Sequence, residues 1–221
     1  MIINRLNETF QGSTQADLYK DVESFRKATQ HYLIVFSTLP LENRNLTTPV
    51  VRLQSIFKND ELISKVTLSQ IIAGIEEKKV KLRVKKFTEK VDYLSAVGQL
   101  IDEEIAAKEL LPSFKLAWKK REEKMSNVFS HGIAIPHMVD ESEHKRILMT
   151  IGILTQPVKY KGKKVSLIFL IGIPKGLDAE LSKVLTKVYD FIFMISGNDD
   201  MYGNLLAYEP ALPLTQITEG I

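Results

Sequence analysis

The residues best suited to chemistry lie in the segment 127–137, which reads Asn-Val-Phe-Ser-His-Gly-Ile-Ala-Ile-Pro-His. Small and polar residues precede a short apolar run, and Pro136 is followed by His137 in a predicted loop at the end of a strand. A histidine in such a place is held rigidly and still meets solvent. Imidazole also titrates near neutral pH, so His137 could act as a nucleophile or carry a phosphoryl group. A histidine that only packs and hydrogen-bonds within the fold fits the same spacing.

The other histidines raise a metal site as a second interpretation. His131, His137 and His144 are accompanied by acidic residues. Their spacing does not place ligands on adjacent turns of one helix, and it matches no zinc pattern. We therefore predict no metal and no cofactor. We expect His144 in a charged surface loop and His31 at the edge of a strand.

The residues Gly132–His137 resemble the active-site signature of the mannitol/fructose-type (type 2) enzyme IIA domain of the bacterial sugar phosphotransferase system. In that family the segment reads approximately Gly-Asn-Gly-Ile-Ala-Ile-Pro-His, and Ser130 and His131 replace the first two residues here. The resemblance implies that His137 accepts phosphate from a carrier protein. It also makes His131 a candidate for supporting the phosphoryl group through a hydrogen bond.

The elements that must position His137 show helix and strand patterns in the same part of the chain. Two amphipathic helices are predicted, one through Leu94, Val97, Ile101 and Ile105, and one from Leu111 through Phe114, Trp118 and Met125. Strands at 147–154 and 165–171 and a long helix after Gly176 follow. The resemblance covers this whole region, including a turn at 156–162 in which Tyr160 replaces the family's tryptophan.

One departure from the family concerns the start of the last helix. Many catalytic enzyme IIA domains carry a second histidine there, which helps to balance the charge of the phosphoryl group. Residues 177–182 read Leu-Asp-Ala-Glu-Leu-Ser, without a histidine, and we expect Glu180 to face solvent. The departure predicts a site that accepts phosphate but passes it on inefficiently.

The first third of the chain also has an α/β pattern. We predict strands at 17–22, 32–37 and 49–53, a helix over 22–30, and a second helix that starts with a capping box at Thr67 and Gln70. The residues Val35-Phe-Ser-Thr-Leu-Pro-Leu41 resemble a strand end of enzyme IIB domains. A working enzyme IIB carries phosphate on a cysteine after its first strand. Because that strand, its loop and any cysteine are missing here, we expect this segment to be non-catalytic.

A charged stretch, 76–86, separates the two regions and fits a solvated linker or an edge strand. We therefore predict an α/β protein with a truncated enzyme IIB-like domain over 1–78, a linker over 79–88 and a type 2 enzyme IIA domain over 82–221. The second domain is expected to contain a mixed sheet flanked by helices.

Composition excludes several other classes of protein. The 221 residues include 44% hydrophobic and 26% charged residues, and the net charge of +3 is too balanced to indicate nucleic acid binding. The absence of cysteine excludes disulfides and thiolate chemistry. The apolar runs are too short to span a membrane, and the N-terminus does not resemble a signal peptide. We expect a cytoplasmic protein without membrane insertion or direct nucleic acid contact.

The resemblance implies a phosphohistidine acceptor rather than a stand-alone enzyme. In the leading hypothesis the chain is the C-terminal part of a sugar-responsive, PRD-containing transcription regulator, and His137 takes phosphate from the phosphocarrier protein HPr. The alternative is a genuine sugar-specific enzyme IIA that hands phosphate to an enzyme IIB during uptake. A non-phosphorylated interaction module and homo-oligomerisation stay open.

Overall fold

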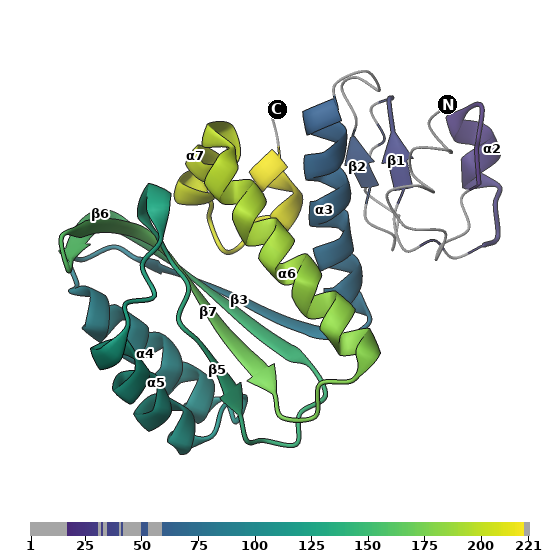
Figure 1. Cartoon of the computed structure of the whole chain (residues 1–221). Helices are drawn as coiled ribbons and strands as arrows, with labels where there is room; N and C mark the ends of the chain where they lie inside the picture. Colours follow the sequence, from purple (N-terminus) through teal and green to yellow (C-terminus); the bar gives the residue numbers. More distant parts are fainter. Residues whose placement is uncertain are drawn as a thin grey trace. The chain divides into compact units, whose positions relative to one another are not determined.

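In the computed structural model of the chain (Figure 1), residues 17–30, 32, 35–39, 41, 50–52 and 59–218 are described. The chain forms two compact units, Met1–Ser69 and Gln70–Ile221. Their boundary lies inside helix α3 (Asn59–Glu76), whereas the sequence predicted the end of the first domain at 78. Each unit is described by itself below.

The first unit contains short elements. Helix α2 (Val22–Arg26) begins after Asp21, whose carboxylate accepts the Ser24 N–H at 2.7 Å; this hydrogen bond lowers the pKa of Asp21. The predicted strand at 17–22 is therefore wrong, because its last residues cap and begin this helix. Strand β1 (Val35–Ser37) pairs in parallel with β2 (Val50–Arg52) within the predicted strands at 32–37 and 49–53. His31 and residues 42–49 lie outside the described residues.

The capping box predicted at Thr67 and Gln70 is wrong, because α3 already begins at Asn59 and Thr67 lies in its interior. Good helix formers such as Glu61, Leu62 and Lys65 extend the helix toward the N-terminus. The predicted apolar stripe is present in part, since Leu68 and Ile71 are fully buried.

The second unit is built on a five-stranded mixed sheet. Its strands are β3 (Val80–Phe87), β4 (Ile133–Ala134), β5 (His137–Asp140), β6 (Ile147–Tyr160) and β7 (Lys163–Pro174). Their order is β3–β6–β7–β4, and β5 also pairs with β7; only β6 and β7 are antiparallel. The edge strand β3 begins within the stretch 76–86, for which a linker or an edge strand was predicted, and it occupies most of the range 79–88 given to the linker.

Helices cover both faces of this sheet, which confirms the predicted fold class. Helices α4 (Tyr93–Ala106) and α5 (Pro112–Lys124) lie on one face, and α6 (Ala179–Gly197) and α7 (Asp199–Ala207) on the other (Figure 1). Asp92 and Asp178 cap α4 and α6, and Pro112 opens α5. Two 3₁₀ turns, η1 (Ser130–Gly132) and η2 (Leu214–Thr218), complete the unit.

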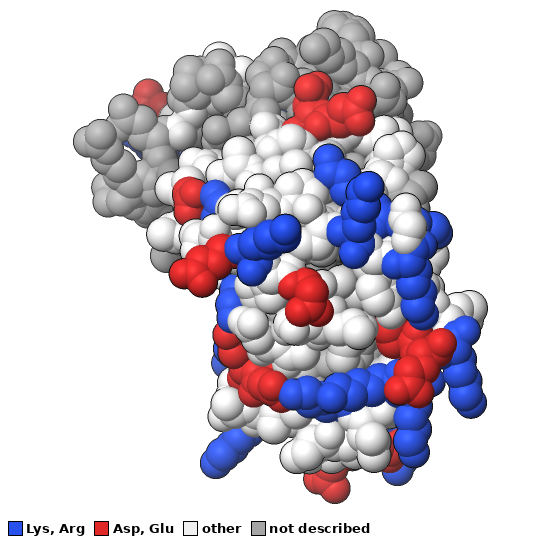
Figure 2. Space-filling view, turned by 90° about the vertical axis from the view of Figure 1, so that its left-hand side faces the viewer, with Lys and Arg blue, Asp and Glu red and all other residues white. Residues whose placement is uncertain are grey.

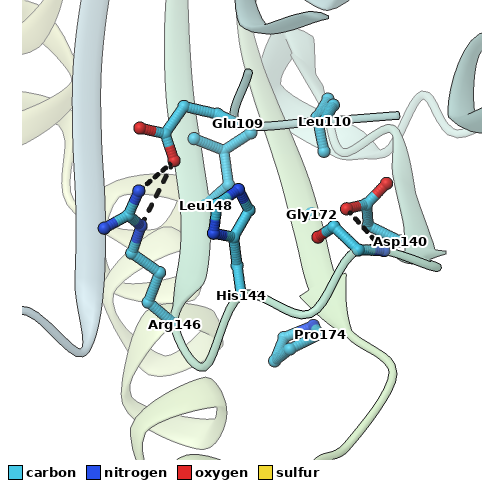
Figure 3. Close-up of a pocket in the computed structure, with 9 residues that line it drawn as sticks. Glu109, Leu110, Asp140, His144, Arg146, Leu148, Gly172 and Pro174 are labelled. Atoms are coloured by element: carbon cyan, nitrogen blue, oxygen red, sulfur yellow. Dashed lines mark hydrogen bonds and ion pairs between the residues drawn. The ribbon is translucent and has the colours of Figure 1, made fainter. Parts of the chain in front are cut away.

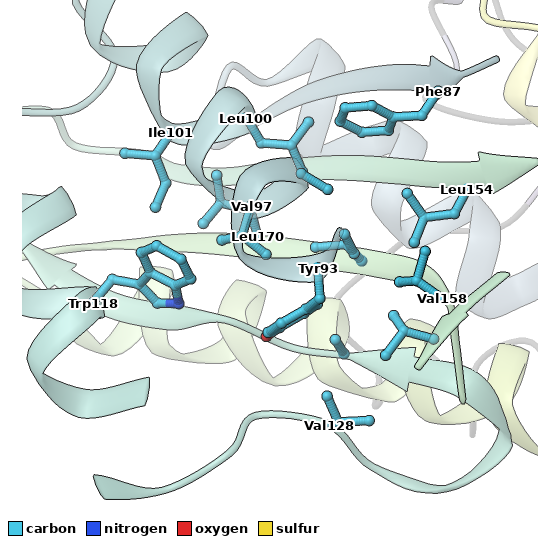
Figure 4. Packing of buried hydrophobic residues seen from close by; sticks show 14 of the residues in the cluster. Phe87, Tyr93, Val97, Leu100, Ile101, Trp118, Val128, Leu154, Val158 and Leu170 are labelled. Carbon is cyan, nitrogen blue, oxygen red and sulfur yellow. The ribbon is translucent and has the colours of Figure 1, made fainter. Parts of the chain in front are cut away.

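The apolar core beneath α4 and α5 holds the site's supporting elements together (Figure 4). Val97, Ile101 and Trp118 lie in it, as the helical patterns predicted. The two long strands that follow extend beyond the predicted ranges. Their register shifts between Ile153 and Val158, and this irregularity accommodates Pro157. Because β6 continues to Tyr160 and β7 begins at Lys163, the connecting turn is shorter than the predicted 156–162.

One carboxylate is buried between α4 and the sheet. Glu104 is 0% exposed; its Oε1 accepts the Thr150 hydroxyl at 2.8 Å and lies 3.2 Å from Nε of Arg83. Its Oε2 has no hydrogen-bond partner among the described residues. Burial is the main cause that raises the pKa of Glu104 above its ordinary value of 4.5, so the fold favours the protonated form.

Glu104 should therefore make stability depend on pH. A group whose pKa is raised by folding contributes stability below its unfolded pKa, and that contribution is lost as pH rises through its folded pKa. We expect the wild type to lose stability above pH 4.5 relative to Glu104→Gln, by at most about 1.4 kcal/mol per pH unit. Urea unfolding at a series of pH values measures this difference. Glu103→Gln, which removes the neighbouring carboxylate that pairs with Lys85, is the control. Parallel curves for wild type and Glu104→Gln would contradict the expectation.

Candidate functional site

His137 is the first residue of β5 rather than a loop residue as predicted. It pairs with Ile171 of β7, and the preceding Pro136 offers its carbonyl to the Ile171 N–H at 2.9 Å. Pairing thus begins immediately before the histidine. The imidazole is half-buried at the edge of the sheet, where it is both held and accessible.

Two hydrogen bonds determine which ring nitrogen of His137 can act as a nucleophile. Nδ1 lies 2.8 Å from the carbonyl oxygen of Ile135, which can only accept, so Nδ1 carries the proton. Nε2 lies 2.8 Å from Nη2 of Arg121, which can only donate. In the neutral ring Nε2 therefore holds the lone pair, and both neighbours favour the same tautomer.

Arg121 is a site residue that the sequence reasoning missed. It lies in the last turn of α5, and the guanidinium also approaches the sulfur of Met138 at 4.0 Å. A guanidinium presents several donors in a fixed plane and suits the oxygens of a phosphoryl group. The sequence did hold signals for it, since Arg121 lies near the end of a predicted helix and begins the stretch Arg-Glu-Glu-Lys-Met-Ser, which resembles the approach to the histidine strand in enzyme IIA domains.

Tyr189, in the middle of helix α6, lies beside His137; the residues at the start of the helix do not. The rings of Tyr189 and His137 meet edge to face with centroids 6.4 Å apart. Burial raises the pKa of Tyr189, and the charge of Arg121 opposes that shift. The tyrosine therefore closes one side of the site as a neutral group.

Glu180 lies at the opposite edge of the sheet. It is exposed, as predicted, and its carboxylate binds Nζ of Lys79 at 2.6 Å, immediately before β3. Strands β6 and β7 separate β3 from β5. With about 4.8 Å between neighbouring strands, Glu180 is roughly 14 Å from the strand of His137, too far to act on its ring.

His131 and Gly132 form the turn η1 that leads into β4. Both have left-handed backbone conformations, with φ of 58° and 73°. A side chain at Gly132 would also meet the Tyr202 hydroxyl oxygen at 2.9 Å, so this turn requires glycine. His131 is exposed and makes no hydrogen bond to another described residue, His137 included.

A polar pocket lies at the far end of β5 (Figure 3). Arg146 forms two hydrogen bonds with Glu109 there, and His144 bonds the Lys108 carbonyl at 2.8 Å. Asp140 accepts the N–H groups of Leu111 and Ser142. These polar groups already have partners. Within the described part of the chain, no group of three or more acidic or histidine side chains could hold a metal ion.

Basic and acidic side chains both lie on the face drawn in Figure 2, where several basic side chains gather toward the upper right. Among the described helices, none has both the length and the apolar character that crossing a bilayer requires.

Comparison with solved structures finds similar folds at low identity. A candidate PTS IIA domain from Streptococcus pyogenes M1 GAS is 18% identical with a TM-score of 0.48, and the match covers 66% of this chain and 91% of that one. A candidate PTS IIA (PtxA) from Streptococcus mutans is 20% identical with a TM-score of 0.43 (66% and 86% covered). The nitrogen regulatory protein IIA-Ntr from Neisseria meningitidis is also 20% identical, with a TM-score of 0.42 (65% and 99% covered). No curated protein matches the chain.

The family assignment comes from the sequence itself. The model of the phosphoenolpyruvate-dependent sugar phosphotransferase system, EIIA 2, matches residues 74–200, which is more than half of the chain. The matched range includes β3 to β7, Arg121 and His137. The chain therefore belongs to the EIIA 2 family of the phosphoenolpyruvate-dependent sugar phosphotransferase system.

Proposed function

We propose that His137 accepts a phosphoryl group on Nε2 from the phosphocarrier protein HPr. The observation that carries the proposal is the pair of hydrogen bonds on its ring: Nδ1 donates to Ile135, and Nε2 meets Arg121. A nucleophilic imidazole needs one nitrogen with a free lone pair, a fixed orientation and a cation beside the incoming phosphate. The ring of His137 meets these requirements.

The transfer balances with groups that are already in place. The Nε2 lone pair attacks phosphorus, the bond from phosphorus to the donor's ring nitrogen breaks, and its electron pair returns to the donor. The proton stays on Nδ1 and keeps its hydrogen bond to the Ile135 carbonyl. This hydrogen bond stabilises the positive charge that develops on the ring. The guanidinium of Arg121 moves from Nε2 to the phosphoryl oxygens, whose negative charge it offsets.

The test of this function is phosphorylation of the full chain by the cascade. After incubation with phosphoenolpyruvate, enzyme I and HPr, intact mass should rise by one phosphoryl group. The label should be lost in acid and be comparatively stable in base, as expected for a phosphoramidate. An unlabelled, correctly folded chain would refute the proposal.

A regulatory role is part of the proposal. We propose a non-catalytic, enzyme IIB-like segment over 1–78, followed by the enzyme IIA domain over 82–221, as the C-terminal part of a PRD-containing transcription regulator acting in the cytoplasm. The absence of cysteine and the short parallel pair of β1 and β2 support the first point. A phosphoryl group adds about −1.5 to −2 charge, which can shift the docking of neighbouring domains.

A regulator and an uptake carrier differ in whether His137 passes its phosphoryl group on to an enzyme IIB. Near His137, α6 supplies Tyr189 and not a second histidine, and the start of α6 lies at the other edge of the sheet. We expect slow loss of label when a purified enzyme IIB is added. Rapid transfer would favour the sugar-specific carrier and leave phosphate acceptance by His137 intact.

A further inference from the structure

Helix α5 buries one carboxylate directly beside the site. Glu122 is only 2% exposed and continues the buried stripe of Phe114 and Trp118, in which each member follows the previous one by four positions. A buried carboxylate is costly unless its oxygens accept hydrogen bonds. A carboxylate in this apolar stripe therefore needs hydrogen-bond partners, and its presence there needs a functional explanation.

The partners of Glu122 come mainly from Asn127, the first residue of the histidine segment. The Asn127 side-chain amide donates to Oε2 at 2.5 Å, and its backbone N–H lies 3.4 Å from both carboxylate oxygens. The Tyr93 hydroxyl is 3.5 Å from Oε2. Burial, followed by the charge of Glu122, raises the pKa of Tyr93, so this hydroxyl stays protonated. Asn127 is itself only 4% exposed.

A chain of hydrogen bonds continues from Asn127 to the imidazole. The Asn127 carbonyl accepts a hydrogen bond from the Ile135 N–H at 2.9 Å, and the Ile135 carbonyl accepts one from Nδ1–H of His137 at 2.8 Å. On the other side of the ring, Nε2 meets Arg121, the residue before Glu122. Glu122 is thus linked to both nitrogens of the ring.

The loop that this carboxylate organises has independent anchors. Lys161 and Lys163 of the β6–β7 hairpin donate to the carbonyls of Glu122 and Val128, at 2.8 and 2.9 Å. Because these bonds use the backbone, they persist when the Glu122 side chain changes. The specific contribution of the carboxylate is the orientation of Asn127 relative to the end of α5.

We infer that Glu122 is a positioning residue for phosphotransfer at His137. Through Asn127 and the Ile135 peptide it keeps the proton on Nδ1, and through the end of α5 it holds Arg121 at Nε2. The inference rests on the proposed function for its effect on rate, whereas its effect on the ring can be measured without any phosphate.

The test compares Glu122→Gln with Glu123→Gln in the full chain. Glu123 is exposed and makes no hydrogen bond or ion pair with another described residue, so it gives a matched loss of charge. In Glu122→Gln the new amide group faces the N–H of Asn127, donor against donor. We expect ¹⁵N spectra of the His137 ring to move toward a mixture of tautomers and phosphorylation by HPr to slow about tenfold, as for outer partners of other positioned histidines. Glu123→Gln should match the wild type in both measurements.

The double variant Glu122→Gln/Asn127→Asp tests rescue, because it reverses donor and acceptor and keeps the charge. It should restore the wild-type ring spectrum and rate; if it folds and restores neither, the inference is wrong. It also decides the question if Glu122→Gln alone does not fold. A Glu122→Gln protein that is less stable but has a wild-type ring and rate would show a purely structural role. If even the wild type is not phosphorylated, the proposed function fails, and the ring spectra still test the positioning.

Discussion

Replacing His137 with alanine is expected to reduce labelling by phosphoenolpyruvate, enzyme I and HPr by more than about a thousandfold, because the nucleophile itself is removed. The half-buried ring packs at the sheet edge and not in the apolar core, so the variant should still fold. The measurement is intact mass of the labelled full chain over time, with far-UV circular dichroism and urea unfolding to establish folding.

Variants of two other histidines complete this test, and His144→Ala is its control. His144→Ala removes a half-buried ring whose one hydrogen bond to a described residue is to the Lys108 carbonyl, and it should be labelled like the wild type. His131→Ala should be labelled more slowly but completely if that ring supports the phosphoryl group, as the sequence suggested. Full labelling of His137→Ala would place the acceptor elsewhere in the chain.

Replacing Arg121 with alanine should slow phosphorylation by about a hundredfold to a thousandfold, the cost of removing one donor from a site that stabilises developing charge. The phosphorylation rate of Arg121→Lys should lie between those of Arg121→Ala and the wild type, since lysine keeps the charge and loses the planar set of donors. Initial rates at several HPr concentrations, measured by rapid quenching, separate the effect on kcat from that on KM.

The control for Arg121 is Lys120→Ala, which removes an exposed cation from the same helical turn. It should leave kcat unchanged. If Arg121→Ala raised KM alone, the guanidinium would serve partner docking and not the transferring group. A wild-type rate would show that the contact with Nε2 has no part in the reaction.

Local patterns in the sequence were sufficient for most of the second unit. Ile101 of α4 and Trp118 of α5 each belong to an apolar repeat at helical spacing, and both pack in the core. The two apolar runs form the long antiparallel pair. These features depend on neighbours along the chain. The start of α3 was misplaced because the capping signal at Thr67 is short, and helix formers upstream override it.

The surroundings of His137 could not be predicted in the same way. Arg121 reaches its ring only because α5 and β5 lie side by side, and Tyr189 does so only because α6 covers the opposite face. Each contact depends on tertiary packing and not on a local motif. Glu122 had a detectable signal, since it is a charge at the third position of an apolar stripe, but its partner Asn127 depends on how the following loop folds.

The most direct test of the account is to locate the phosphorus–nitrogen bond by NMR. The full chain, with ¹⁵N-labelled histidine, is phosphorylated through HPr, and ³¹P–¹⁵N coupling identifies the bonded ring nitrogen. The account predicts coupling to Nε2 of His137 while Nδ1 keeps its proton, because the Nδ1–H group donates a hydrogen bond to the Ile135 carbonyl in the structure. Coupling to Nδ1 of His137, or to another histidine, would contradict it.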